Sequence, residues 1–127
     1  MNLTVTGEIS NRQYDRVIDI DRIEFTDKTK KLDCYVEIPR LDSLISIENS
    51  KSLSVTISDE ENALAKIKDP TMVLNTTLYM VRKSGDKSSE NIYQFSAGGI
   101  ILRFMTKEQL PFKLRGNKVF KLILKAS

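Results

Sequence analysis

The sequence predicts an all-β protein that folds as a closed antiparallel barrel or a sandwich of about eight short strands in one domain, residues 1–127. Apolar and polar residues alternate with period two through most of the chain, and short polar connections separate the alternating segments. A length of 127 residues suits a single core that needs no disulfide or structural metal. Periodicity alone does not choose between barrel and sandwich.

The clearest alternation places Leu32, Cys34, Val36 and Ile38 on one face of a strand. Where the alternation slips phase, near Val17, we expect a bulge within a strand. The predicted strands cover residues 3–9, 14–25, 32–38, 52–58, 72–82, 92–97, 99–105 and 119–125.

Polar connections at 27–30 and 83–88 predict two hairpins. One helix is expected over residues 59–68, because Ser58 and Glu61 have the spacing of a capping box. Asp69-Pro70 would end that helix. A one-turn helix is expected to begin at Thr106.

The composition argues against catalysis and metal binding. The chain contains no histidine, the commonest general base and metal ligand at neutral pH. Its single cysteine, Cys34, lies on the apolar side of a strand and is interpreted as a core residue. We therefore predict no catalytic residues, no metal and no cofactor, and we rank an enzyme last among the possible functions.

Positive charge gathers near the end of the chain. The net charge is +3, but residues 101–127 carry seven Lys or Arg and one acid, Glu108. Such asymmetry is typical of a face for nucleic acid, and equally of a solvated rim. The candidates for weak single-stranded nucleic-acid contact are Arg82, Lys113, Arg115 and Lys118.

The segment 91–104 is not a generic strand. Gly98-Gly99 interrupts two alternating segments and indicates either a tight bend or the close approach of another backbone. Ile100, Ile101 and Leu102 are consecutive apolar residues, so both faces of that strand require cover.

This segment also carries a family resemblance. The small eighth subunit shared by the eukaryotic nuclear RNA polymerases, which has an archaeal counterpart, contains an aromatic-Ser-aromatic-Gly-Gly-Leu-Leu-Met-Arg stretch. The present chain resembles it, and the archaeal form in particular, at Tyr93-x-Phe95-Ser96-x-Gly98-Gly99-Ile100-Ile101-Leu102-Arg103. Residues 14–20, 32–39, 52–57 and 120–125 resemble further segments of the family in the same order. Ala97 replaces an aromatic residue, and the short segment 59–68 replaces a long insertion.

The resemblance implies an OB-type barrel and a non-catalytic subunit that docks on the largest polymerase subunit, among other polymerase subunits. It implies association with the nucleoid through the polymerase. A single cysteine favours a reducing cytosolic compartment, and no apolar run is long enough to span a bilayer, so we predict a cytoplasmic location and no membrane contact. Carried over by position, the docking residues are Tyr93, Gly98, Gly99, Ile101 and Arg103. These five residues have an alternative role as internal determinants of the barrel. The alternative function is an autonomous OB-fold protein that binds single-stranded nucleic acid.

Overall fold

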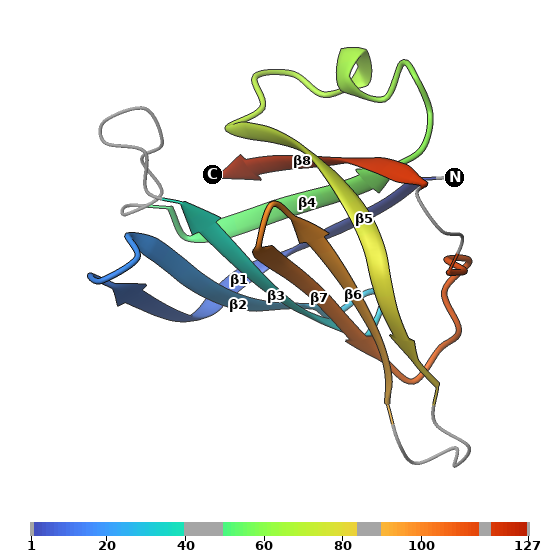
Figure 1. Cartoon of the computed structure of the whole chain (residues 1–127). Helices are drawn as coiled ribbons and strands as arrows, with labels where there is room; N and C mark the ends of the chain where they lie inside the picture. Colours follow the sequence, from blue (N-terminus) through green and yellow to red (C-terminus); the bar gives the residue numbers. More distant parts are fainter. Residues whose placement is uncertain (1, 40–49, 84–89, 115–117, 127) are drawn as a thin grey trace.

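Eight strands close into one antiparallel barrel in the computed structural model, which describes residues 2–39, 50–83, 90–114 and 118–126 (Figure 1). Around the barrel, neighbouring strands follow the order β1-β2-β3-β7-β6-β5-β8-β4. The prediction of an all-β closed barrel is confirmed, and the sandwich alternative is wrong. The strands are β1 (Asn2–Asp15), β2 (Ile20–Asp27), β3 (Leu32–Pro39), β4 (Ser52–Ser58), β5 (Met72–Arg82), β6 (Asn91–Ala97), β7 (Ile100–Thr106) and β8 (Val119–Ala126).

The predicted strand over 14–25 is wrong in its boundaries. β1 continues to Asp15, the chain turns over residues 16–19, and β2 begins at Ile20. Asp19 has a φ of 56°, a left-handed conformation typical of a turn. The slip in alternation near Val17 is therefore a hairpin turn rather than a bulge. The irregularity in this pair of strands lies earlier in β1, between Ile9 and Asn11.

The predicted helix over 59–68 is also wrong. Between β4 and β5 the described residues contain one turn of 3-10 helix, η1 (Leu64–Lys66). The Ser58 hydroxyl accepts the N–H of Glu60 at 3.0 Å, which forms a local turn instead of a capping box. A ten-residue helix is marginal without tertiary support, and the ion pair from Asp59 to Lys118 holds this segment to the barrel instead.

The one-turn helix expected from Thr106 is absent, because Thr106 is the last residue of β7. Its hydroxyl accepts the N–H of Glu108 at 3.1 Å and turns the chain there. The hairpin at 27–30 is confirmed by the antiparallel pairing of β2 with β3. Most of the hairpin predicted at 83–88 lies outside the described residues, although the flanking strands β5 and β6 do pair antiparallel.

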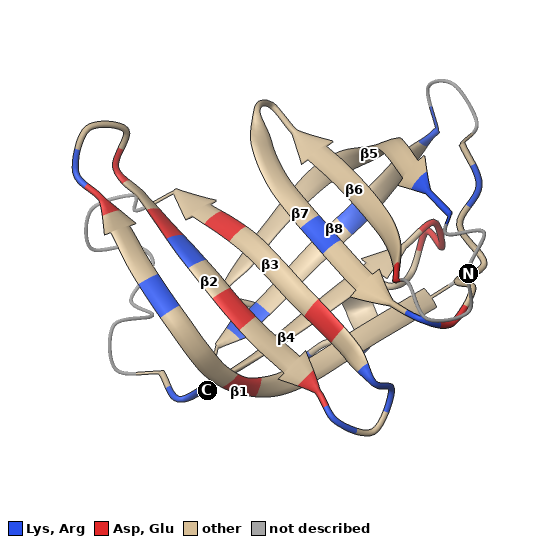
Figure 2. Cartoon of the chain, turned by 90° about the horizontal axis from the view of Figure 1, so that it is seen from below, with Lys and Arg blue, Asp and Glu red and all other residues tan. Residues whose placement is uncertain are grey.

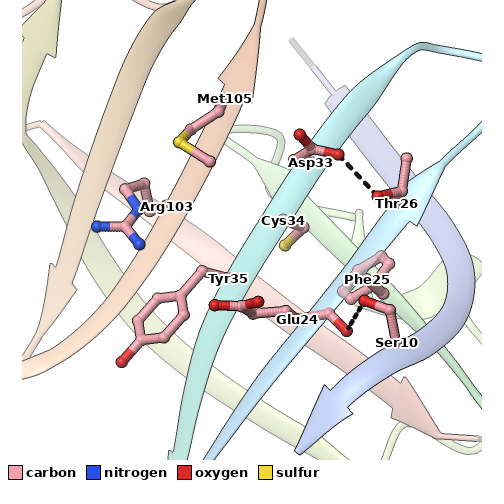
Figure 3. A pocket seen from close by; sticks show the side chains of 9 residues that line it. All are labelled: Ser10, Glu24, Phe25, Thr26, Asp33, Cys34, Tyr35, Arg103 and Met105. Carbon is pink, nitrogen blue, oxygen red and sulfur yellow. Dashed lines mark hydrogen bonds between the residues drawn. The ribbon is translucent and has the colours of Figure 1, made fainter.

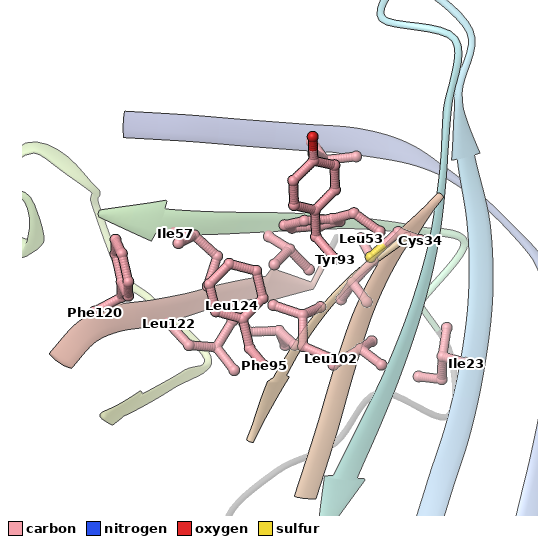
Figure 4. Close-up of a cluster of buried hydrophobic side chains, with 14 of the residues drawn as sticks. Ile23, Cys34, Leu53, Ile57, Tyr93, Phe95, Leu102, Phe120, Leu122 and Leu124 are labelled. Carbon is pink, nitrogen blue, oxygen red and sulfur yellow. The ribbon is translucent and has the colours of Figure 1, made fainter. Parts of the chain in front are cut away.

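The interior of the barrel is a continuous apolar core (Figure 4). Phe95 lies at its centre and meets Phe104, Phe112 and Phe120 edge-on, with ring centroids 5.9, 5.3 and 5.7 Å away. Phe112 comes from the segment after β7 and is only 1% exposed. Cys34 is buried in the same core, as predicted, and burial raises the pKa of its thiol well above the ordinary value.

The outer side of the β4–β8 pair is covered by the chain itself. Thr56 pairs with Ile123, and both alternate with core residues, so their side chains point out of the barrel. Nevertheless Ile123 is 1% exposed and Thr56 is 7% exposed. The connection 59–71, which contains the buried Ala63, is drawn above β8 in Figure 1, and we infer that it provides the cover. We call this region the covered face.

Candidate docking face

A second outer surface lies on β3 and β7 and lacks such cover among the described residues. β3 and β7 are distant in sequence but pair antiparallel, with Tyr35 opposite Arg103 and Val36 opposite Leu102. Because side chains alternate across a strand, one set points out of the barrel. We call this set, together with the β6–β7 turn, the docking face: Tyr35, Glu37, Gly98, Gly99, Ile101, Arg103 and Met105.

Arg103 lies at the middle of the docking face and stacks on an aromatic ring. Its guanidinium carbon is 4.8 Å from the centroid of the Tyr35 ring, within the range of a cation–π contact. The Arg103 Nε is buried and has no hydrogen-bond partner among the described residues. A buried donor without a partner is costly, and this one belongs to a permanently charged group. The arrangement is suited to accept a carboxylate or a carbonyl oxygen.

Glu37 connects Tyr35 on β3 with β7 through hydrogen bonds. Its carboxylate accepts the backbone N–H of Ile101 at 3.0 Å and the hydroxyl of Tyr35 at 2.9 Å. Arg22 on β2 lies 3.5 Å from the same carboxylate. Burial, followed by the hydrogen bond to Glu37, raises the pKa of Tyr35 above its ordinary value. Glu37 is therefore occupied with holding β7 and Tyr35 in place.

A shallow hollow of about 270 Å³ lies beside this cluster, over β2, β3 and β7 (Figure 3). Arg103 and Met105 line it from β7, and the carboxylates of Glu24 and Asp33 line its other side. The remaining lining residues are Ser10, Phe25, Thr26, Cys34 and Tyr35. No group of three or more potential metal ligands occurs among the described residues. The hollow offers mixed polar and apolar contacts to a neighbouring surface.

Gly98 and Gly99 form the tight turn between β6 and β7. Their φ angles are 60° and 94°, and two successive positive values are the requirement of a type I′ hairpin turn. An added Cβ at either position would meet nothing within 4 Å. Of the two explanations offered by the sequence, the tight bend accounts for both glycines. They place an exposed turn at the end of the docking face.

Tyr93 does not belong to this surface, and its assignment as a docking residue is corrected. Its side chain points into the barrel and is 0% exposed. The hydroxyl accepts the backbone N–H of Leu110 at 2.9 Å, and the ring meets Phe112 edge-on. Tyr93 is therefore an internal determinant that fastens the segment after β7 to the core. Ile101 and Arg103 are partly exposed, as a docking role requires.

The residues predicted to contact nucleic acid have different neighbours in the structure. Arg82 ends β5, and Lys113 lines a hollow with Lys83, the residue after Arg82. Lys118 instead forms an ion pair with Asp59 at 2.8 Å, which lowers the pKa of that carboxyl to about 2. Arg115 lies outside the described residues. Two of the four residues are therefore near one another, and Lys118 holds the covered face.

Sequence reasoning missed Tyr35 and Glu37. Alternation along residues 32–38 does place both on the outer side of their strand. The missing information was that β3 pairs with β7, about seventy residues further along the chain. No local pattern reports a pairing between strands that are distant in sequence. With that pairing known, the ring of Tyr35 is the natural support for Arg103.

A scan against models of known protein families finds no match to this chain, and a search of curated proteins finds no relative. Within the part of the chain that the structure describes, no helix is long and apolar enough to cross a membrane.

Proposed function

We propose that this protein is a non-catalytic accessory subunit of a multisubunit DNA-dependent RNA polymerase. It docks on the largest subunit through the docking face and supports assembly or stability of the enzyme. The docking face is the observation that supports the proposal. Residues of the family resemblance lie on this face, and the described part of the chain does not cover it. The polymerase places the protein in the cytoplasm, at the nucleoid, with other polymerase subunits as neighbours.

The chemistry of the face suits a protein partner. Ile101 and Met105 are partly exposed apolar side chains on one strand, and Arg103 lies between them. A carboxylate from the partner would satisfy the Arg103 guanidinium, and the ring of Tyr35 would keep water from it. Well-packed arginine and tyrosine side chains at the centre of an interface are the usual source of its binding energy.

An OB-type description of the barrel forms part of this proposal. The first three strands form a meander, and β4 returns to pair with β1. The common OB fold is a five-stranded Greek-key barrel. In this chain the additional strands β5 to β8 lie between β3 and β4 and complete the closed ring.

The second candidate is an autonomous OB-fold protein that binds single-stranded nucleic acid. Its supporting observation is a row of stacking and polar groups across three neighbouring strands, with Arg103 opposite both Tyr35 and Gln94. Tyr79 on β5 extends the same row, because its hydroxyl accepts a hydrogen bond from Gln94, and it is 46% exposed. Bases can stack on such rings beside a cation. Binding of this kind weakens steeply as salt concentration rises.

The decisive experiment is purification of the tagged protein from its native organism with high-salt washes, followed by identification of co-purifying chains by mass. We expect the large polymerase chains in near-equal amounts. Arg103→Glu should abolish their recovery, because it reverses the charge at the centre of the docking face. Lys121→Glu is the matched control, since Lys121 is an exposed cation on β8, away from that face.

Purification of the chain alone would overturn the polymerase proposal. Binding of single-stranded oligonucleotides only at low salt would then favour the second candidate. Equal loss of polymerase from Arg103→Glu and Lys121→Glu would show that the docking face is wrongly placed.

A further inference from the structure

The turn between β1 and β2 exposes apolar side chains that the fold of this chain does not require there. Val17 is 92% exposed, Ile18 is 53% exposed and Tyr14 is 43% exposed. We call residues 14–19 the hairpin tip. A single exposed apolar residue is ordinary, but three on one projecting turn form a small apolar patch.

The hairpin tip is held in one conformation by its own polar groups. The Asp15 carboxylate accepts the backbone N–H of Val17 at 2.9 Å and that of Ile18 at 3.4 Å. Arg22 on β2 forms an ion pair with the same carboxylate at 3.1 Å. Across the turn, the Tyr14 hydroxyl donates to Asp19 at 2.5 Å. The turn is therefore ordered before any partner arrives, which reduces the entropic cost of binding.

The hairpin tip and the Gly98-Gly99 turn project from the same end of the sheet (Figure 2). Ile20, the first residue of β2, pairs with Pro39, the last residue of β3. β7 runs antiparallel to β3, so its first residues and the preceding turn also lie at that end. A partner seated on the docking face around Ile101 would extend naturally to the hairpin tip.

We propose that the hairpin tip is a second anchor, which inserts Val17 and Ile18 into an apolar pocket of the same subunit that contacts the docking face. This inference rests on the proposed function. A protein pocket fits better than a lipid surface, because carboxylates at Asp15 and Asp19 flank the apolar residues. Arg16 and Arg22 balance the charges of Asp15 and Asp19, so the hairpin tip and its ion pair offer no excess positive charge to anionic headgroups. Two β-branched side chains fit a small pocket with little loss of rotamer freedom.

Thiol protection gives a direct test, because the only natural cysteine is buried. Val17→Cys places one reactive thiol on the hairpin tip, and Val119→Cys is the matched control at a residue 54% exposed on β8. Both thiols should react rapidly with a maleimide in the free chain. In purified polymerase containing the variant chain, we expect the Val17→Cys thiol to react at least tenfold more slowly. The Val119→Cys thiol should react at its original rate.

Three results would overturn the hairpin-tip anchor while the proposed function stands, each observed with the chain still co-purifying with polymerase. The first is equal labelling of the Val17→Cys thiol in the free chain and in the assembly. The second is protection already in the free chain, which would mean that the chain covers its own tip. The third is protection by phosphatidylserine vesicles, which would mean a lipid surface. Failure of the unaltered chain to co-purify would instead overturn the proposed function, and the anchor with it.

A second variant checks the energetics of the same contact. Val17→Asp should leave the urea midpoint of the free chain unchanged, because Val17 contributes almost no buried area. Its retention on polymerase in high salt should fall at least tenfold, whereas Val119→Asp should be retained like the unaltered chain. Full retention of Val17→Asp would contradict the anchor.

Discussion

The covered face and the docking face have similar sequences but differ in the exposure of their outward side chains. Each has three consecutive apolar residues, Leu122-Ile123-Leu124 on β8 and Ile100-Ile101-Leu102 on β7. On β8 the outward Ile123 is 1% exposed, and the connection 59–71 is drawn above that strand in Figure 1. On β7 the outward Ile101 is partly exposed among the described residues. An apolar triplet predicts cover on both sides of a strand; this cover is present over β8, and under the proposed function a partner would provide it over β7.

The largest expected effect separates these two isoleucines in the free chain. Ile123→Ala should lower the free energy of unfolding by about 2–5 kcal/mol, since it leaves a cavity between β8 and its cover. Ile101→Ala is the matched control and should cost less, about 1–2 kcal/mol, because its side chain is only partly buried. Urea denaturation of the two variants measures the difference. Equal losses would mean that the two faces are equally packed in the free chain.

The next effect concerns the turn at the end of the docking face. Gly99→Ala should cost about 1–2 kcal/mol, because a φ of 94° strains any residue with a Cβ. Gly98→Asn should be close to neutral, since Asn-Gly is the preferred pair of a type I′ turn. Urea midpoints of both variants test this. A large loss from Gly98→Asn would show that the turn is constrained by more than its backbone conformation.

Much of this comparison was accessible from the sequence. Period-two alternation is a local property, so the strands containing Cys34 and Leu122 were placed correctly. The pattern at Val17 predicts a bulge instead of a turn, because a hairpin without glycine or proline lacks the usual turn signal. The segment after Ser58 predicts a helix from its capping pattern, but a local pattern does not report the tertiary contacts of the segment, among them the ion pair from Asp59 to Lys118.

In the candidate site, too, local features could be predicted from the sequence, and the side of the strand on which a residue lies was harder to predict. The apolar run at Ile101 predicts a strand that needs cover on both faces, and the Gly-Gly pair predicts a bend; the structure has a partly exposed strand and an exposed turn there. The resemblance assigns Tyr93 a docking role because it gives positions and does not report which side of a strand a residue occupies. Its neighbour in alternation, Phe95, is also buried, so strict period two from Phe95 would have assigned Tyr93 to the core.

A smaller effect concerns the ion pair that fastens the covered face. The hydrogen bond from Lys118 lowers the pKa of Asp59 to about 2, from an ordinary value of 3.8. A carboxyl with a lowered folded-state pKa stabilises the protein fully above its unfolded pKa, and this contribution is lost as the pH falls toward about 2. The pair is near the surface, so the loss should stay below about 1 kcal/mol.

Asp59→Asn removes this titration and provides the measurement. Thermal unfolding of both proteins should show that the unaltered chain is the more stable at pH 6 and that its advantage shrinks between about pH 4 and pH 2. An advantage that is constant across this range would show that the Asp59 charge contributes nothing to folding.

The smallest effect on the free chain is expected at Arg103, the residue on which the docking face depends. Arg103→Met keeps a long apolar stem over the ring of Tyr35 and removes a buried Nε that has no partner among the described residues. Loss of the cation–π contact, about 0.5–1 kcal/mol, offsets the gain from removing that donor. Urea denaturation should therefore show that the free energy of unfolding changes by less than about 0.5 kcal/mol. Retention on polymerase should fall by roughly 30-fold or more, the effect of losing a central interface residue.

The sequence leaves two roles open for Arg103, a docking residue or an internal determinant of the barrel, and Arg103→Met distinguishes them. If Arg103 were an internal determinant of the barrel, Arg103→Met would destabilise the free chain and would reduce retention only as far as folding is lost. If Arg103 serves the docking face, Arg103→Met should reduce retention on polymerase while the stability of the free chain stays nearly unchanged. Ile101→Ala should show the same difference in weaker form. Ile123→Ala should show the reverse, with a large loss of stability and, in the folded fraction, normal retention. We therefore expect a strand surface that binds a partner to have this signature: replacing its side chains changes the free energy of unfolding of the free chain little but weakens retention on the partner.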